Sequence, residues 1–311
     1  MDNLLIVPSV RETEWVQDVL PGTSPAELPV AGRRIIDYAL ECARKRNVMF
    51  TEILDWRFST RLAADFSDLT RTGMPVFYTK GEGDIPRGLA DVEGVSSPLT
   101  QTISDDLVVV WGLYAGSAQS DVPLEPVSAA EVVETPPGMY RREGGRWMRF
   151  ADNGRNVDGI RVWHALNFDV LRRPDTFTLP GYSAEKDVHL GRNVVLEKGT
   201  EVKAPALLQD NIWCARNVGL LGNVIVGSGA FIAEGATLKG TVVCDNTFIG
   251  SGLELTDKIV AGRRIIDVSS ECWTDVDEPG LAGDIRRHGV GWRWLRAVWH
   301  FMRGRSYGRR G

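Results

Sequence analysis

Apolar residues recur at every sixth position between Leu190 and Ile259. In steps of six from Leu190, the first residue is always apolar and the fifth is small or aliphatic, with one residue missing just before Val242. An α-helix repeats about every 3.6 residues, so this pattern does not describe a helix face and predicts short strands instead. The first positions, which we expect to point inward, are Leu190, Leu196, Val202, Leu208, Cys214, Leu220, Val226, Ile232, Leu238, Val243, Ile249 and Leu255.

The six-residue period predicts a parallel β-helix, in which short strands form the three faces of a prism. Three steps make one coil, so residues 190–259 should form about four coils. Residues such as Gly191, Asn193 and Asp210 permit the corner conformations between strands. The alternative is a sandwich of short strands, which has turn signals about every 8 to 12 residues and no fixed frame. The pattern resembles the left-handed β-helix of hexapeptide-repeat transferases.

Strands and helical segments alternate in the N-terminal half. Apolar runs predict strands over Leu4–Val10, Met74–Thr79 and Asp106–Tyr114, and amphipathic spacing predicts a helix over Ile35–Arg46. This alternation is typical of an α/β domain with a mainly parallel sheet.

Several segments of this half resemble sugar nucleotidyltransferases, in the order that the family has them. LPVAGRRIIDYALE (residues 28–41) resembles the segment that follows the phosphate-binding loop, and DIPRGLAD (84–91) is similar to the Pro-x-Gly-Leu-Ala segment. Residues 140–150 resemble the hairpin after the central strand, with its turn at Gly144 and Gly145, and residues 161–174 resemble the closing strand and helix. The resemblance implies a nucleotide or sugar nucleotide as ligand, with the backbone near the nucleobase supplied by Pro86, Gly88, Leu89 and Ala90.

The expected fold class is therefore an α/β nucleotidyltransferase-like (Rossmann-like) domain followed by a left-handed parallel β-helix and a short C-terminal amphipathic helix. We assign residues 1–182 to the first domain, residues 183–267 to the β-helix, and residues 268–311 to a basic, tryptophan-rich tail.

The chemical motifs of the resembled family are missing at three places. The first strand is followed by PSVRETEWVQD, where the family has a Gly-rich loop with an arginine, and Pro25-Ala26 replaces a Lys-Pro pair. Leu113 occupies the position of a metal-binding aspartate, and leucine cannot bind magnesium. Nucleotidyl transfer needs backbone amides, a basic side chain and carboxylates around the phosphates and the metal. We therefore expect weak or no catalysis and no metal site.

Two active alternatives remain open. A nucleotidyltransferase could use Arg11, Lys80 and Asp91 as substitutes, and only then would Mg²⁺ be its cofactor. A hexapeptide-repeat acyltransferase would need a histidine as general base, for which His164 and His189 are the candidates. A lone histidine in a strand-like segment is more often a surface or interface residue.

Composition and charge are those of an ordinary globular protein. With 311 residues, 43% of them apolar and 25% charged, the chain can form two domains, and its net charge of -5 argues against general nucleic-acid binding. No run of about 18 apolar residues and no secretory signal is present, so we expect a cytoplasmic protein. The four cysteines lack CxxC spacing and predict neither a disulfide framework nor a zinc site.

The C-terminal tail differs from the rest, because its last 27 residues contain eight arginines and no acidic residue. A helix over residues 291–303 would separate a tryptophan-rich face from a basic face, as at a membrane interface. Residues 284–311 are therefore expected to bind the inner face of the membrane or a membrane glycosyltransferase. The alternative is a helix that docks its tryptophans onto the β-helix or a partner protein.

The expected function follows from these observations together. The chain is predicted to be a sugar nucleotidyltransferase-like protein of cell-envelope or exopolysaccharide biosynthesis, with weak or no transfer and a scaffolding role. The β-helix offers a surface for homo-oligomers. VAGRRIID occurs twice, at residues 30–37 within the segment that resembles nucleotidyltransferases and at residues 260–267, where Gly262 should turn the chain off the end of the β-helix. Both copies need a turn at glycine, but no physical reason requires all eight residues to be identical.

Overall fold

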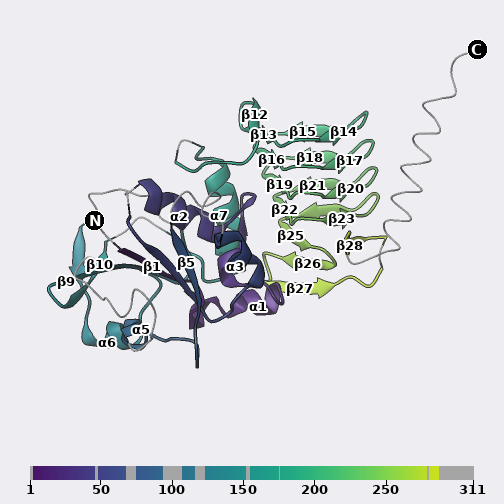
Figure 1. The fold of residues 1–311 in the computed structure, drawn as a ribbon. Helices are drawn as coiled ribbons and strands as arrows, with labels where there is room; N and C mark the ends of the chain where they lie inside the picture. Colours follow the sequence, from purple (N-terminus) through teal and green to yellow (C-terminus); the bar gives the residue numbers. More distant parts are fainter. Residues whose placement is uncertain are drawn as a thin grey trace, which may run out of the picture. The chain divides into compact units, whose positions relative to one another are not determined.

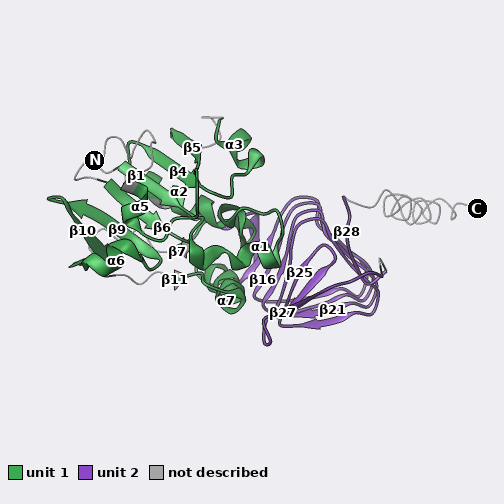
Figure 2. Cartoon of the chain, turned by 90° about the horizontal axis from the view of Figure 1, so that it is seen from below, with its two compact units in different colours: residues 1–178 green, residues 179–311 purple. Residues whose placement is uncertain are grey.

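The computed structural model describes residues 3–45, 48–67, 75–93, 107–115, 123–151, 155–174, 176–278 and 280–286. The chain divides into two compact units, residues 1–178 and 179–311, which Figure 2 shows in two colours. The helix and the basic, tryptophan-rich face expected over residues 291–303 lie outside the described residues. No described helix is long and apolar enough to span a membrane.

Unit 1 is built around a seven-stranded sheet with the order β5-β4-β1-β6-β9-β10-β8 (Figure 1). Strands β5, β4, β1 and β6 are parallel, whereas β9 pairs antiparallel with β6, β10 with β9, and β8 with β10. The pairs β2–β3 and β7–β11 lie outside this sheet. The bounds are β1 Asn3–Val7, β2 Pro29–Val30, β3 Arg33–Arg34, β4 Thr51–Asp55, β5 Val76–Lys80, β6 Leu107–Trp111, β7 Tyr114–Ala115, β8 Leu124–Pro126, β9 Gly138–Glu143, β10 Arg146–Phe150 and β11 Arg155–Asn156.

Helices cover both faces of this sheet. Side chains alternate between the two faces of a strand, so neighbouring residues of β1 enter different cores. On one face Leu40 of α2 and Leu62 of α3 pack in the same core as Ile6, and on the other Leu89 of α5 packs with Leu5. The helices are η1 Arg11–Thr13, α1 Trp15–Val19, η2 Pro25–Glu27, α2 Ile35–Lys45, α3 Thr60–Phe66, α5 Leu89–Glu93, α6 Ala129–Val133 and α7 Ile160–Leu171.

The predicted α/β organisation of the N-terminal half is confirmed, and its strands and first long helix correspond to β1, α2, β5 and β6. The hairpin expected over residues 140–150 is β9–β10, with Gly144 and Gly145 both at positive φ. The strand and helix expected over residues 161–174 are wrong, since these residues lie in and after the single helix α7. Its buried Ile160, Trp163 and Val170 recur at helical rather than strand spacing.

Unit 2 consists of parallel strands arranged in three sheets, which Figure 2 shows in cross-section. The first sheet holds β12 Tyr182–Glu185, β13 Val188–Leu190, β16 Ala206–Leu208, β19 Val224–Val226, β22 Thr241–Val243, β25 Lys258–Ala261, β26 Arg264–Asp267 and β27 Cys272–Asp275. The second holds β14 Val195–Leu196, β17 Trp213–Cys214, β20 Phe231–Ile232, β23 Thr247–Ile249 and β28 Ala282–Asp284. The third holds β15 Glu201–Lys203, β18 Gly219–Leu221, β21 Thr237–Lys239 and β24 Glu254–Thr256.

The strand register agrees with the spacing of the sequence pattern. Ala206 pairs with Val224, 18 residues further on, and Val224 pairs with Thr241, 17 residues further on. The shorter step spans the residue missing from the pattern. These parallel strands are compatible with a β-helix, and its left hand stays a prediction. Strands β12, β26, β27 and β28 pair antiparallel at the margins of the sheets.

The predicted inward positions from Leu208 onward are buried, but those of the first coil are not. Leu190 and Val202 are half-buried, and Leu196 is 40% exposed. The cause is the end of the stack, because β14 and β15 are the first strands of their sheets and have no strand above them. The expectation that Leu196 points into a closed interior is therefore wrong.

The first copy of VAGRRIID makes a two-residue hairpin turn. β2 and β3 pair Val30 with Arg33, so Ala31 and Gly32 form the turn, with φ of 42° and 79°. Positive φ at both positions is the signature of a type I′ turn. The Ala31 N–H donates a hydrogen bond of 2.8 Å to the side-chain oxygen of Asn167, so α7 holds this turn. The chain then enters α2.

The second copy also makes a hairpin turn, but its register is shifted by one residue. Ala261 pairs with Arg264, so Gly262 and Arg263 form the turn, with Gly262 at φ 59°. Glycine in the first turn position is typical of type II′. The chain continues as β26 and pairs with β27 instead of entering a helix. Eight identical residues therefore adopt two structures, and their neighbours decide between them.

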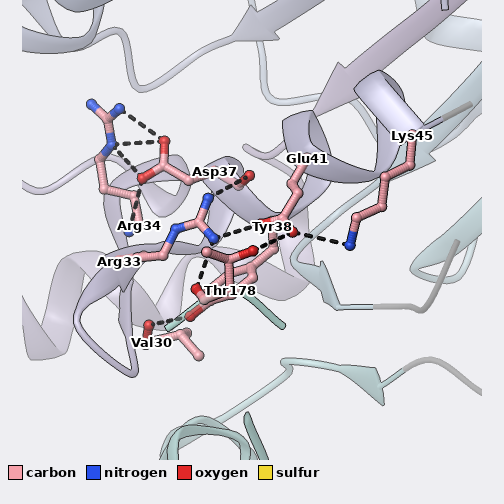
Figure 3. Close-up of polar contacts among 8 residues, drawn as sticks. All are labelled: Val30, Arg33, Arg34, Asp37, Tyr38, Glu41, Lys45 and Thr178. Carbon is pink, nitrogen blue, oxygen red and sulfur yellow. Dashed lines mark hydrogen bonds and ion pairs between the residues drawn. The ribbon is translucent and has the colours of Figure 1, made fainter. Parts of the chain in front are cut away.

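Arg33 of the first copy anchors the end of unit 1 (Figure 3). Its Nη1 lies 2.6 Å from Glu41 Oε2 and donates to the Thr178 carbonyl oxygen at 3.0 Å. The Thr178 hydroxyl and the Lys45 ammonium reach Glu41 Oε1 at 2.7 and 3.0 Å. Burial by itself raises the pKa of the Glu41 carboxyl, but the hydrogen bonds from Arg33, Thr178 and Lys45 lower it to about 2.

We expect Glu41→Gln to remove part of the acid sensitivity of the protein. A carboxyl whose pKa is lowered on folding stabilises the fold above its unfolded pKa of about 4.3, and this contribution is lost as the pH falls toward the folded pKa. After allowance for solvent screening, acidification through this range lowers the free energy of unfolding by about 2 kcal/mol through Glu41. The measurement is the melting temperature of both proteins between neutral and strongly acidic pH, where the two curves should converge. Glu254→Gln, at an exposed position of β24, is the control, and parallel curves for Glu41→Gln and the native protein would contradict the prediction.

Candidate functional site

The parallel part of the sheet in unit 1 defines one edge where a ligand can bind. The chain runs from β1 to β4 and β5 on one side of β1, and then crosses from β5 to β6 on the other side. In open α/β sheets, ligands bind outside the carboxyl ends of the strands at such a switch point. The segments that follow β1, β4, β5 and β6 therefore form the candidate site.

The segment after β1 is a closed turn rather than an open loop. The Thr13 hydroxyl contacts the carbonyl oxygens of Pro8 and Val10 at 3.0 and 2.8 Å, and it accepts a hydrogen bond of 3.0 Å from the Val10 N–H. Val10 and Thr13 are each only 1% exposed. The amide of Val10 is thus used inside the turn, and its side chain fills the core.

The segment after β6 also places an apolar residue at the switch point. Gly112 extends the hydrogen bonding between β6 and β1, because its N–H donates to the carbonyl oxygen of Val7 at 2.9 Å. Leu113, which follows, is 1% exposed, and its carbonyl accepts a hydrogen bond of 2.7 Å from Val157. The side chain at the expected position of the metal-binding aspartate is therefore part of the core.

A buried carboxylate connects the segments after β1 and β4. Asp55, the last residue of β4, is 0% exposed and accepts hydrogen bonds from the hydroxyls of Ser9, Ser24 and Tyr78. The Ser24 and Tyr78 bonds measure 2.6 and 2.7 Å, and the Arg57 N–H adds a fourth at 2.9 Å. Burial and the negative charge of Asp55 raise the pKa of the Tyr78 phenol far above its ordinary value. Tyr78 is therefore a permanent donor to this carboxylate.

Lys80 is the last residue of β5 and is exposed. The next residues return to the end of β4, because Gly81 donates to the Asp55 carbonyl oxygen at 3.0 Å and the Trp56 indole N–H donates to the Glu82 carbonyl oxygen at 3.1 Å. A side chain at Gly81 would collide with the Trp56 ring. Gly81, at the start of the loop after β5, therefore has a structural role, because it allows this loop to pack closely against Trp56.

The segment expected near a nucleobase is tied to the body of unit 1. Asp91 Oδ2 accepts hydrogen bonds from the N–H groups of Arg87 and Gly88, at 2.7 and 3.2 Å. The Leu89 N–H donates to the Thr135 hydroxyl at 2.9 Å, and the Leu89 side chain is 0% exposed. Of the four residues proposed to contact the base, Pro86, Gly88 and Leu89 are buried and Ala90 is exposed.

The structure places the three substitute catalytic residues in separate elements. Arg11 begins η1 after β1, and Lys80 ends β5, with β4 between those two strands. Strands two positions apart are about 10 Å apart in a sheet. Asp91 lies in α5 and caps the turn before it. The two basic residues thus share one edge of the sheet, whereas the Asp91 carboxylate is engaged in its own turn.

The residues present do not fit a Mg²⁺ site. Magnesium requires oxygen ligands in near-octahedral geometry, usually including one or two carboxylates. Within the described ranges, no three His, Cys, Asp or Glu side chains are grouped so that they could hold a metal ion. Asp55 and Asp91 both direct their oxygens at hydrogen-bond donors of the protein itself.

The two histidines considered for acyl transfer lie in different units. His164 is in helix α7, which corrects the expected strand-like setting, and its ring contacts that of Phe168 edge-to-face at 4.9 Å. His189 is the middle residue of β13 and is half-buried.

Sequence reasoning did not identify the group around Asp55. Ser9, Ser24, Asp55 and Tyr78 are far apart along the chain, and only the order β5-β4-β1 brings them together. One available signal was a polar residue at the end of the apolar stretch TEILD, since the ends of parallel strands meet at one edge of the sheet.

Comparison with known proteins gives one partial similarity. No protein-family model matches the chain. A UTP–glucose-1-phosphate uridylyltransferase of Synechocystis sp. is 24% identical over 131 residues, which is 42% of this chain and 31% of that protein. The chain thus matches about a third of the length of this curated relative. The similarity suggests a sugar nucleotidyltransferase-like family, the class that residues 28–41 and 84–91 resemble.

Proposed function

We propose that this chain is a sugar nucleotidyltransferase-like protein of cell-envelope or exopolysaccharide biosynthesis. It binds a nucleotide or sugar nucleotide at the carboxyl ends of β1, β4, β5 and β6 and carries out little or no nucleotidyl transfer. The observation that carries this proposal is the closed turn after β1. This turn lies at the sheet edge where the ligand is expected to bind. It contains the buried Val10 and Thr13 instead of a row of glycine amides that could hold phosphates.

Three features support the binding part of the proposal. The strand order β5-β4-β1-β6 creates a switch point, where α/β proteins bind their ligands. The partial similarity is to an enzyme named for UTP and glucose 1-phosphate, so a uridine nucleotide and a hexose phosphate are the first ligands to test. The exposed Arg11 and Lys80 on the same sheet edge supply positive charge for an anionic ligand.

Two features support weak or absent transfer. Phosphoryl and nucleotidyl transfer depend on metal ions that neutralise the charge developing on the phosphates. Leu113 is buried where the family places a carboxylate, and the carboxylates of Asp55 and Asp91 are occupied by protein donors. These three described positions therefore offer no free carboxylate for a metal ion that would stabilise the transition state.

The experiment is a pyrophosphate-release assay with Mg²⁺, in which UTP and the other nucleoside triphosphates are each combined with sugar 1-phosphates. We expect no release above background, because no group of metal ligands is found among the described residues and the turn after β1 is closed. The Synechocystis uridylyltransferase serves as the positive control under the same conditions. Robust turnover would contradict the proposal, and variants of Arg11, Lys80 and Asp91 would then identify the residues responsible.

We also propose that residues 284–311 attach the protein to an anionic membrane surface, where it could scaffold a membrane glycosyltransferase. Apolar burial at the headgroup boundary acts together with about 1 kcal/mol for each arginine near the surface. The full-length protein should sediment with anionic vesicles and be released by high salt.

The matched truncation should end after Arg286, so that strand β28 is kept whole. Strand β28 spans Ala282–Asp284 and pairs with β23, and the Ile285 N–H donates to the Asn246 carbonyl oxygen at 2.9 Å. This shorter chain should keep its thermal transition and stay in the supernatant. If it sediments as strongly as the full-length protein, the tail is not the membrane anchor.

A further inference from the structure

The surroundings of Asp55 have the composition of a small oxyanion site. Each carboxylate oxygen accepts two hydrogen bonds: Oδ1 from Ser9 and the Arg57 N–H, and Oδ2 from Ser24 and Tyr78. A carboxylate has about four lone-pair sites, so the hydrogen-bonding capacity of Asp55 is filled. It has none left for a ligand or a metal ion.

The donors converge from four separate segments of unit 1. Ser9 lies in the turn after β1, Ser24 precedes η2, Tyr78 belongs to β5, and the Arg57 amide lies in the turn after β4. Ser24 and Tyr78 are also fixed by further contacts, because the Ser24 hydroxyl accepts from the Ala26 N–H and the Tyr78 hydroxyl accepts from the Ser59 N–H. The backbone therefore holds these hydroxyls in place independently of Asp55.

We propose that Ser9, Ser24, Tyr78 and the Arg57 amide form an oxyanion-binding cup that the chain fills with its own Asp55 carboxylate. The ligand class of the cup is a small oxyanion, a carboxylate or inorganic phosphate. In the native protein Asp55 excludes such groups from these donors at the carboxyl ends of β1 and β4. A nucleotide bound at this edge must therefore place its phosphates elsewhere, toward β6. The cup itself does not depend on nucleotide binding, because its donors and its carboxylate belong to the protein.

The test removes the carboxylate from the full-length chain and offers it back in solution. Asp55→Ala leaves a space of the size of formate, and Asp55→Gly leaves a space of the size of acetate. Both variants leave four donors without their acceptor, of which Ser9 and Ser24 are buried, so we expect the melting temperature to fall by about 10 °C. Added formate should raise the melting temperature of Asp55→Ala by several degrees, and acetate that of Asp55→Gly, because an anion that binds only the folded state stabilises it.

Three controls separate filling of the cup from general salt effects. Chloride at the same ionic strength should not reproduce the rescue. Asp55→Asn keeps the cup occupied, so it should lose stability without responding to formate or acetate. Thr51→Val removes a buried hydroxyl of the same strand that has no hydrogen-bond partner among the described residues, and it should leave the melting temperature almost unchanged. Inorganic phosphate should stabilise Asp55→Gly more than the native protein.

The outcomes decide the proposal without reference to nucleotides. Anion-specific rescue of the Ala or Gly variant supports the cup, whether or not the native protein binds a nucleotide. If both variants fail to fold in chloride, refolding in formate or acetate should recover soluble protein, and equal recovery in chloride would count against the proposal. Folded variants that respond to formate and acetate no more than the native protein does would overturn it.

Discussion

Ile232→Asp is expected to destabilise the protein by about 4 kcal/mol or more, the largest effect we predict. Ile232 is 0% exposed, and its strand β20 lies between β17 and β23 in the second sheet of unit 2. It is in register with Cys214 on one side and Ile249 on the other, and both neighbours are also 0% exposed. A carboxylate in this column would be buried among apolar side chains, so the folded state must bury its charge, protonate it at a cost in free energy, or unfold.

The measurement is urea unfolding followed by circular dichroism. Ile232→Val keeps the apolar column and should cost about 1 kcal/mol. Lys239→Asp places the same carboxylate at an exposed position of β21, the next strand along the chain, and should change the unfolding midpoint little. If Ile232→Asp unfolds at the same urea concentration as Lys239→Asp, the conclusion that Ile232 packs inside unit 2 between Cys214 and Ile249 is wrong.

Gly88→Ala should cost about 3 kcal/mol through packing, the second-largest effect. A Cβ at position 88 would collide with the carbonyl oxygens of Val132 and Val133 at the end of α6. These are backbone atoms, so the clash is relieved only by moving α5 away from α6. The resemblance to nucleotidyltransferases assigns this glycine to backbone approach to a nucleobase, which predicts weaker ligand binding with the fold unchanged. The structure adds a packing reason that acts without any ligand.

Thermal unfolding without ligand distinguishes the two roles. A lowered melting temperature of Gly88→Ala in ligand-free protein supports the packing role. An unchanged melting temperature would mean that Gly88 matters only for ligand binding. Gly83→Asn is the control in the same loop, because Gly83 has a φ of 78° and open space around it. Asparagine tolerates this left-handed conformation, so the control should stay close to the native protein.

Periodic patterns predicted the fold well where every residue of a repeat has the same role. In unit 2 the apolar first positions gave the strands and even the single shorter step between Val224 and Thr241, because each side chain lies beside its equivalent in the next parallel strand. The exposure of Leu196 could not be read from the pattern, which is the same in terminal and internal coils. The two copies of VAGRRIID show that a local sequence of eight residues does not by itself determine the structure. Asn167 of α7 holds one turn, whereas β27 pairs with the strand after the other.

Departures from the family's motifs are visible in the sequence, but the hydrogen bonds found at those places could not be predicted from it. Leu113 and the missing glycines were visible as departures from a linear motif. The hydrogen bonds to Asp55 depend on strand order, since Ser24 and Tyr78 precede and follow it by 31 and 23 residues. The tie between Asp91 and the amides of residues 87 and 88 is local, but nothing in DIPRGLAD distinguishes a capping aspartate from a catalytic one.

The central claim is that unit 1 binds a nucleotide or sugar nucleotide without transferring a nucleotidyl group. The most direct test is isothermal titration calorimetry of the full-length protein with the nucleoside triphosphates and the corresponding nucleoside diphosphate sugars. We predict saturable binding of at least one of them, weakened by Arg11→Ala or Lys80→Ala and present without Mg²⁺, since the described residues do not fit a metal site. No heat of binding with any ligand of either class would contradict the claim.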